Sequence, residues 1–349
     1  MRRLIVPVVA IALLIGIAPA TARQQAQPSL RFGVYPGNQF TFGKYAGLTG
    51  TNAVEPVGEL ALDRMVELAG GKPFDVHLYA DWRVGAGPDL DEAIRRIDAR
   101  GLRVNLALKY VPPDGRDGDI VGFAAWVAGV VRSHRTVDVW QITNEANVIG
   151  SPDTDGGATD PLGALIEGVK AAAEAKRRNQ KVGFNWFYRL DPVSDQRFWS
   201  TLGTRGGDAF RAAVDYAGVD IYAGTYIPPL YAVDDEAEYR RALEYVRDEM
   251  MPLAGLGPWV PIYIQETGYP TVDPVIRTEA RQAHALKGYI RATQGLNVQL
   301  LQWFQLADAN SALGDGWGLL RADYTPKPAF EVMRRAQRSA SPARRAAAR

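Results

Sequence analysis

Hydrophobic residues make up 47% and charged residues 23% of this 349-residue chain, which contains no Cys. Such a composition is typical of a globular protein with a large core, and it excludes a disordered chain and a small disulfide-stapled one. The net charge of +1 conceals an acidic body. Without Arg2, Arg3 and the six arginines after Met333, residues 23–333 carry 32 basic and 39 acidic side chains, a net charge of −7. A negatively charged body argues against nucleic acid as a partner.

The first residues have the layout of a secretory signal peptide. Arg2 and Arg3 precede an apolar run over 4–20, and Ala20-Thr21-Ala22 offers a small-residue cleavage site. A membrane anchor is the alternative, but a run this short that contains prolines is near the lower limit for spanning ~30 Å of hydrocarbon. We therefore expect a signal peptide over 1–22, a secreted or extracytoplasmic protein without stable membrane insertion, a folded domain over 23–338, and a disordered basic tail over 339–349.

The chain alternates between strand-like and helical patterns. Runs of β-branched and aromatic residues predict strands over 30–35, 74–82, 102–110, 137–142, 181–188, 218–222, 262–264 and 298–306. Apolar residues at helical spacing predict helices over 58–69, 89–100, 120–133, 161–179, 198–216, 237–251, 278–294 and 328–338. Eight strand–helix units predict an α/β fold of the (β/α)8, or TIM barrel, type. A doubly wound sheet is less favoured, because no GxGxxG phosphate loop follows the first strand.

Two of the predicted strands end in a glutamic acid. The stretch 137–147 (VDVWQITNEAN) leads from buried residues to Asn144 and Glu145, and the stretch 260–270 (VPIYIQETGYP) leads to Glu266. Catalytic groups of such barrels lie at the carboxyl ends of the strands. Strands four and seven are three places apart in a ring of eight, so we expect Glu145 and Glu266 to face each other across the mouth.

The other strand ends contribute amides and aromatic rings. The candidate binding residues are Tyr35, Trp82, Asn144, Asn185, Trp186, Tyr222 and Trp303, together with Trp317 in a Gly-rich loop after the eighth strand. Aromatic faces stack on the apolar face of a sugar ring, and amides bind its hydroxyls. Two carboxyl groups are what hydrolysis of a glycosidic bond requires. These residues therefore indicate an oligo- or polysaccharide as the partner.

The motifs TNEAN at the fourth strand, QETGYP at the seventh and LQWFQLAD at the eighth resemble those of the clan A retaining glycoside hydrolases. The resemblance implies a (β/α)8 fold and a glycosidase acting on β-linked sugars, and the pattern over 1–22 predicts that it is secreted. It implies that Glu145 is the acid/base, that Glu266 is the nucleophile and that Asn144 binds the sugar's 2-hydroxyl. It further implies that Trp303 floors the −1 subsite, and that Tyr222, or as second candidate Tyr226, hydrogen-bonds the nucleophile. No cofactor and no metal are implied.

Some residues depart from the pattern of that clan. Many members have an Arg late on strand two and a His on or after strand three. Here strand two offers His77, Tyr79 and Arg83, and strand three ends in Lys109-Tyr110 with no His. Ala146 follows the Asn-Glu pair where Pro is frequent. These departures keep open a second interpretation, in which the chain is a non-catalytic carbohydrate-binding barrel.

Metal-dependent chemistry has weaker candidates. The loop 151–161 contains Asp153, Asp155 and Asp160 but lacks the closing Glu of a twelve-residue Ca²⁺ loop, so a solvated loop is expected. The three His residues are scattered along the chain, whereas a metal hydrolase requires clustered ligands. A phosphate-dependent barrel enzyme is disfavoured as well, since aromatic residues replace a Gly-rich phosphate loop after the last strands.

Overall fold

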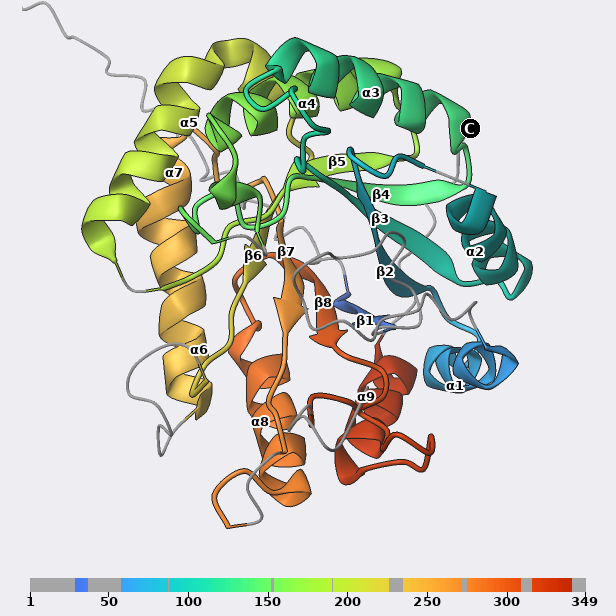
Figure 1. The fold of residues 1–349 in the computed structure, drawn as a ribbon. Helices are drawn as coiled ribbons and strands as arrows, with labels where there is room; N and C mark the ends of the chain where they lie inside the picture. Colours follow the sequence, from blue (N-terminus) through green and yellow to red (C-terminus); the bar gives the residue numbers. More distant parts are fainter. Residues whose placement is uncertain are drawn as a thin grey trace, which may run out of the picture.

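A computed structural model describes residues 29–36, 58–86, 88–151, 154–189, 191–225, 235–271, 275–308 and 316–340. In these ranges, parallel strands β1 to β8 pair in sequence order, and β8 pairs with β1 to close the barrel. Helices surround the barrel on its outside (Figure 1). The predicted (β/α)8 fold is therefore confirmed. The signal peptide, Tyr226, Asp153 and the tail after Ala340 lie outside the described residues.

The strands match the predicted ones with small shifts at their ends. They are β1 Arg31–Tyr35, β2 Phe74–Asp81, β3 Arg103–Lys109, β4 Val137–Ile142, β5 Lys181–Phe184, β6 Tyr216–Asp220, β7 Ile262–Thr267 and β8 Val298–Phe304. The largest differences are at β5, which stops four residues early, and at β6, which lies two residues earlier than expected. As a result β6 ends at Asp220, and this places a third acidic residue at the mouth.

The helices also follow the predicted order. They are α1 Glu59–Ala69, α2 Pro88–Ala99, α3 Ile120–Ser133, α4 Pro161–Ala175, α5 Pro192–Ala213, α6 Asp235–Glu244, α7 Met251–Leu253, α8 Glu279–Ala292 and α9 Pro328–Ser339, with a π-helical turn Tyr245–Met250 between α6 and α7. Within α5, Gly207 has a positive φ of 60° and interrupts the helical backbone. None of the described helices combines the length and the apolar character needed to cross a membrane.

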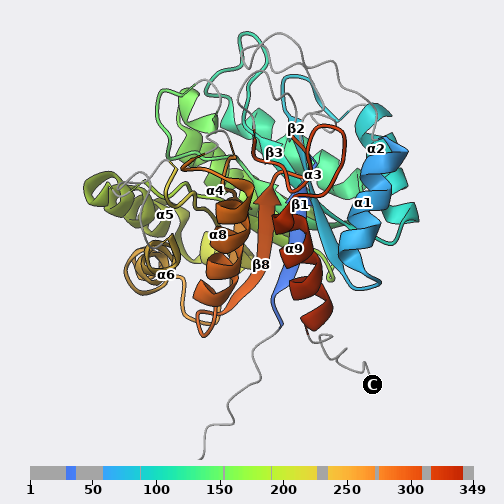
Figure 2. The ribbon, with the colours of Figure 1, turned by 90° about the horizontal axis from the view of Figure 1, so that it is seen from below.

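Alternation along the strands decides which side chains face the helices and which fill the barrel. On β8, Trp303 points outward, where its ring lies 6.3 Å from that of Tyr289 on α8. The next residue, Phe304, points inward and stacks on Tyr35 of β1 at 4.8 Å. Viewed from below, α8 and α9 flank β8 (Figure 2). Strand β8 thus separates one aromatic cluster under the helices from another inside the mouth.

A layer of polar side chains fills the barrel below the mouth. The Gln265 amide accepts a hydrogen bond from Asn105 and donates one to the Tyr216 hydroxyl, both at 2.7 Å. His77 lies in the same layer, and burial lowers its pKa to about 4, so the imidazole is neutral at physiological pH. Neutral side chains that hydrogen-bond to one another thus fill this layer. The interior of the barrel is a packed core, and the site lies at its rim.

Candidate active site

The turn after β4 has an unusual backbone. Thr143 and Glu145 both have positive φ values, 64° and 52°, in the left-handed region that side chains with a Cβ rarely adopt. Such conformations persist only where the surrounding structure enforces them, and they concentrate at functional sites. The turn reverses the chain within three residues, and it brings Asn144 and Glu145 to the mouth side by side.

Asp155 holds this turn from the loop that follows it. Its Oδ2 accepts hydrogen bonds from the backbone amides of Asn144 at 2.8 Å and Tyr110 at 2.6 Å, which joins the ends of β3 and β4. Burial raises the pKa of Asp155 to about 6, while nearby Lys109 and the two amides oppose the shift. The expectation of a solvated loop was therefore wrong at Asp155, which is buried because two orphan amides need its oxygen.

Glu266, near the end of β7, lies opposite this turn. Tyr222 donates a hydrogen bond to its Oε2 at 2.7 Å, and Tyr79 of β2 donates one to its Oε1. Burial raises the pKa of Glu266 to about 8. The two hydroxyls favour the carboxylate, because they bond to the charged form. Two neutral tyrosines thus hold this acid.

Three carboxyl groups meet at the centre of the mouth. Glu145, Asp220 and Glu266 each offer an oxygen, and the three oxygens lie within 4.8 Å of one another. They come from the ends of β4, β6 and β7, so the barrel closure itself brings them together. The separation of the two glutamic acids is on the scale of the ~5–5.5 Å found in retaining glycosidases, below the ~6.5–9.5 Å of inverting ones. The same three oxygens are also a possible donor set for a divalent cation.

Asn185 connects three strand ends beneath the carboxyl groups. Its Oδ1 accepts a hydrogen bond from the Glu145 amide at 2.7 Å. Its Nδ2 donates to Asn144 Oδ1 at 3.0 Å and to Asp220 Oδ2. Because the Asn185 side chain is fully buried, it positions its neighbours and does not form a surface for a sugar. Sequence reasoning placed Asn185 at the site but gave it the wrong task.

An aromatic wall stands beside Glu266. The half-buried ring of Trp317 meets Tyr222 edge to face at 5.4 Å and Phe304 at 5.9 Å. Tyr35 lies under Phe304, to which it is stacked. Exposed parts of such rings are suited to the apolar face of a pyranose. Of the predicted binding residues, Tyr35, Tyr222 and Trp317 therefore lie together at the mouth.

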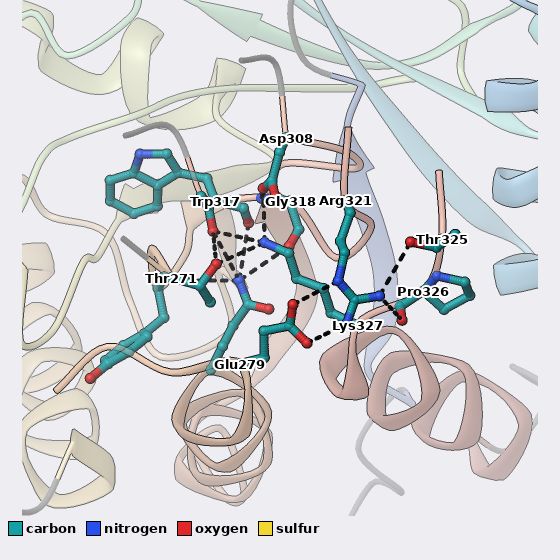
Figure 3. A network of polar contacts seen from close by, with 12 residues as sticks. Thr271, Glu279, Asp308, Trp317, Gly318, Arg321, Thr325, Pro326 and Lys327 are labelled. Carbon is teal, nitrogen blue, oxygen red and sulfur yellow. Dashed lines mark hydrogen bonds and ion pairs between the residues drawn. The ribbon is translucent and has the colours of Figure 1, made fainter. Parts of the chain in front are cut away.

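A buried lysine fixes the loop that carries Trp317 (Figure 3). Lys327 Nζ donates to Asp308 Oδ1 at 2.8 Å, to Thr271 Oγ1 at 2.9 Å and to the Gly316 carbonyl at 3.1 Å. Asp308 in turn accepts the Gly318 amide at 2.8 Å. These bonds join the loops after β7 and β8 on both sides of Trp317, which is thereby held against Tyr222.

Three predicted binding tryptophans lie elsewhere. Trp303 is fully buried under α8, and its indole N–H donates to the Trp317 carbonyl at 3.0 Å. Trp186 is fully buried against Trp199 in the helix layer. Trp82 is stacked on Tyr110 at 6.0 Å and nearly buried. The prediction that Trp303 and Trp186 bind sugar was wrong, because alternation turns both rings toward the helices. The role of Trp82 stays a prediction. At β8 the inward ring is that of Phe304.

Sequence reasoning missed Asp220 and Phe304 as site residues, and it gave Tyr79 no role. Asp220 was overlooked because β6 was placed two residues late. A signal was present, since the run YAGVD ends in an acid as the β4 and β7 stretches do. Phe304 follows Trp303 directly, and the two side chains point to opposite faces of β8. The sequence does not show which of them faces the mouth.

Comparisons with known proteins bear on the fold. No family model and no curated protein matches the chain. A family 1 β-glucosidase from Thermotoga maritima matches with a TM-score of 0.62 at 13% identity, over 88% of this chain and 97% of that one. A β-glucuronidase from Ruminococcus gnavus matches with a TM-score of 0.57 at 16% identity, over 89% of this chain and 49% of that one. The chain shares the fold of glycoside hydrolases.

A further match is a family 39 glycoside hydrolase from Bacteroides cellulosilyticus, with a TM-score of 0.57 at 13% identity, over 89% of this chain and 64% of that one. The chain thus spans about half to two thirds of the length of this protein and of the glucuronidase. The implied resemblance to clan A glycoside hydrolases is confirmed at the level of the fold. The roles implied for individual residues stay predictions.

Proposed function

We propose that the protein is a retaining glycosidase that acts on β-linked oligo- or polysaccharides. The observation that carries the proposal is the meeting of Glu145 and Glu266, from opposite sides of the barrel, with oxygens within 4.8 Å. An approach this close is more in keeping with the ~5–5.5 Å between the carboxyl groups of retaining enzymes than with the ~6.5–9.5 Å of inverting ones. We also propose, from the pattern over 1–22, that the protein acts outside the cytoplasm.

In the first step the Glu266 carboxylate attacks the anomeric carbon and forms an ester to the sugar. The bond to the leaving oxygen breaks as Glu145 transfers its proton to that oxygen. In the second step Glu145, now a carboxylate, removes a proton from water. The oxygen of this water displaces Glu266 and restores both carboxyl groups to their first state.

The protonation states set a condition on this mechanism. Glu266 must be ionised to attack, yet burial raises its pKa to about 8. Tyr79 and Tyr222 oppose the effect of burial by donating to both carboxylate oxygens. We therefore expect the acid limb of the pH–rate profile to lie well above the ordinary carboxyl range, and activity to rise with pH through neutrality.

Substrate binding is assigned to the aromatic wall and to Asn144. Trp317 and Phe304 offer half-buried rings next to Glu266, as a pyranose would require. Three matched proteins are described as a β-glucosidase and as β-glucuronidases, so both neutral and acidic sugars belong in the first substrate panel.

The test combines turnover and trapping. A panel of aryl β-glycosides identifies any substrate, and NMR of the first product distinguishes retention from inversion of the anomeric configuration. A 2-fluoro glycoside of the same sugar should then label a single peptide containing Glu266, seen as a mass increase. Product of inverted configuration, or a label elsewhere, would contradict the assignment.

A non-catalytic carbohydrate-binding barrel is the second candidate. One observation favours it: the described residues place no Arg or His against Glu266, which is buried with a raised pKa. Calorimetric titration with oligosaccharides separates the two candidates. Binding without turnover at any pH between about 5 and 10 would favour the second, since this range covers the acid limb expected above.

A further inference from the structure

We propose that Asp220 is a positioning residue of this site that works as a neutral carboxylic acid. In this form it orients the Asn185 amide and, through that amide, Asn144 and Glu145. The inference rests on the proposed function, because it assigns a task in the same reaction. It also makes a claim about protonation that can be tested without turnover.

The first argument is the charge of the cluster. Double displacement needs one carboxylate and one carboxylic acid in the pair Glu145 and Glu266. Asp220 has an oxygen within 4.8 Å of each of them and is fully buried. Like charges at this distance in a low dielectric do not ionise together, so a third carboxylate would oppose the ionisation of Glu266. A proton on Asp220 leaves the cluster with the single negative charge that the chemistry uses.

The second argument concerns the groups that surround Asp220. Its neighbours come from three strands. They are Glu145 after β4, the side chain and backbone amide of Glu266 on β7, and the side-chain amide of Asn185 after β5. Tyrosines 216 and 239 are further titratable neighbours, and neither is positively charged in any form. Burial raises the pKa of Asp220 well above its ordinary value, against the two amides. The described residues give Asp220 no basic partner.

The third argument is the difference between its two oxygens. Oδ2 accepts a hydrogen bond from Asn185 Nδ2. Oδ1 is buried and receives no hydrogen bond from the described residues. An ionised carboxylate would leave the lone pairs of Oδ1 unsatisfied, at the cost of an unpaired buried charge. A neutral acid carries its proton on Oδ1 and keeps Oδ2 as the carbonyl oxygen that accepts from Asn185.

The consequence for the reaction runs through Asn185. Asn185 Oδ1 accepts a hydrogen bond from the Glu145 N–H only in one of the two orientations of its side-chain amide. This orientation is favoured because Nδ2 then donates to two acceptors. One acceptor is Asp220 Oδ2 and the other is Asn144 Oδ1. Without Asp220 this amide loses the partner that decides its orientation, and the strained turn at Glu145 loses a fixed support.

The variants Asp220→Asn and Asp220→Ala separate a neutral acid from an ionised one. Asn has the shape of a neutral acid and retains a carbonyl oxygen for Asn185, so Asp220→Asn should leave both limbs of the pH profile of kcat/KM in place. Asp220→Ala should lower kcat about tenfold or more, because an orienting hydrogen bond is lost. If Asp220 were ionised, Asp220→Asn would shift both limbs to lower pH by about one unit or more, and the proposal would be wrong.

Infrared difference spectra of the free enzyme at pH 7 provide the readout that needs no turnover. Wild type minus Asp220→Asn should contain the C=O band of a protonated carboxyl group. Asp195→Asn is the matched control, since Asp195 is another buried acid, located in α5 away from the mouth. A carboxylate band in place of the acid band would overturn the proposal even if no substrate is found.

A cation in the cluster is the competing way to balance its charge. Calorimetric titration with Mg²⁺, Ca²⁺, Mn²⁺ and Zn²⁺ tests it on wild type and Asp220→Asn. We expect no binding that depends on Asp220, and Asp220-dependent binding would overturn the neutral-acid assignment. Absence of glycoside turnover by wild type, with the acid band present, would instead contradict the proposed function alone.

Discussion

Two buried acidic sites lie at the mouth of this barrel, and they balance their charge in different ways. Asp308 is paired with the ammonium group of Lys327, which is 2% exposed. Glu266 is bonded to two neutral tyrosines and has Asp220 and Glu145 beside it. Burial raises the pKa of both Asp308 and Glu266, but only at Asp308 does a cation oppose it. The ion pair of Asp308 and Lys327 therefore has a structural role. The cluster of Glu145, Asp220 and Glu266 retains protons that are suited to acid–base catalysis.

The two sides of the mouth also differ in backbone strain. Lys327 joins the loops after β7 and β8 through three acceptors. On the other side, Thr143 and Glu145 have left-handed backbone conformations that the surrounding hydrogen bonds enforce. Substitutions on the first side should thus act mainly on stability and substrate binding, and substitutions on the second mainly on turnover.

The largest effect is expected for Glu266→Gln. An amide cannot form the ester to the sugar, so turnover should be lost on every glycoside, whatever the leaving group. The measurement is kcat on the best aryl glycoside and on a natural oligosaccharide, with binding followed by calorimetry. Residual turnover of either substrate at a tenth of the wild-type rate would contradict the role of nucleophile.

Glu145→Ala should divide substrates by leaving group. Loss of a general acid typically costs ~10²–10⁴ in rate, but a glycoside with an acidic phenol needs little protonation. We therefore expect a large loss of kcat/KM on an alkyl glycoside and a small loss in the first step on a dinitrophenyl glycoside. Added azide should speed the second step by replacing water. Equal losses on both substrates would argue against the assignment.

Lys327→Met should destabilise the folded protein by about 1.5–3 kcal/mol, because it removes the cation that is paired with the half-buried Asp308 and leaves that carboxylate only the Gly318 amide. Urea unfolding measures this, and KM should rise more than kcat falls as Trp317 loses its support. The double variant Lys327→Met/Asp308→Asn should recover part of the loss. Arg321→Gln is the control: the pair of Arg321 and Glu279 is 45% and 32% exposed and belongs to the same region, so a change under about 1 kcal/mol is expected.

Glu266→Gln should also stabilise the protein in a pH-dependent way. The pKa of Glu266 is about 8 in the folded protein against an ordinary 4.5, so above pH 4.5 the unfolded chain loses a proton that the folded one retains. Wild-type stability therefore falls as pH rises from 4.5 to 8, and Gln removes this loss. Urea unfolding should show an advantage on the order of 4–5 kcal/mol at pH 8 that vanishes near pH 4, since 3.5 pKa units correspond to roughly that free energy. A constant difference would contradict the shifted pKa.

The smallest effect is expected for Tyr222→Phe. Its hydroxyl bonds to the charged form of Glu266, so its loss should raise the pKa of that carboxyl further. The acid limb of kcat/KM should move up by about one unit, the equivalent of one such hydrogen bond. Tyr245→Phe is the control, because the Tyr245 hydroxyl bonds to Asp195 in the helix layer. A limb that stays in place would show that the hydroxyl does not favour the carboxylate.

Much of this fold is readable in the sequence because helix and strand periodicity alternate without interruption. The helix over 120–133 was predicted at its observed bounds, and the meeting of Glu145 and Glu266 follows from the order of strands in a closed barrel. Sequence reasoning succeeded where a feature depends on which strand a residue follows.

Features that depend on which side chains at a strand end point into the barrel were harder to predict. Whether Trp303 or Phe304 faces the mouth depends on one residue of alternation, which the aromatic run does not reveal. Asp155 reaches the amide of Asn144 from eleven residues further along the chain, through a loop without periodicity. The protonation of Asp220 depends on burial and on neighbours from three other strands, and no local pattern records these.

The Asp155 contact has a consequence for protein engineering. The Thr143–Asn147 turn keeps its shape because a carboxylate from the following loop satisfies two amides at once. If only the Thr143–Asn147 segment were transplanted into another barrel, the turn would lack the Asp155 carboxylate that holds its shape. A transferable unit must include residues 143–155 and a recipient whose third strand ends with a free N–H at the position of Tyr110.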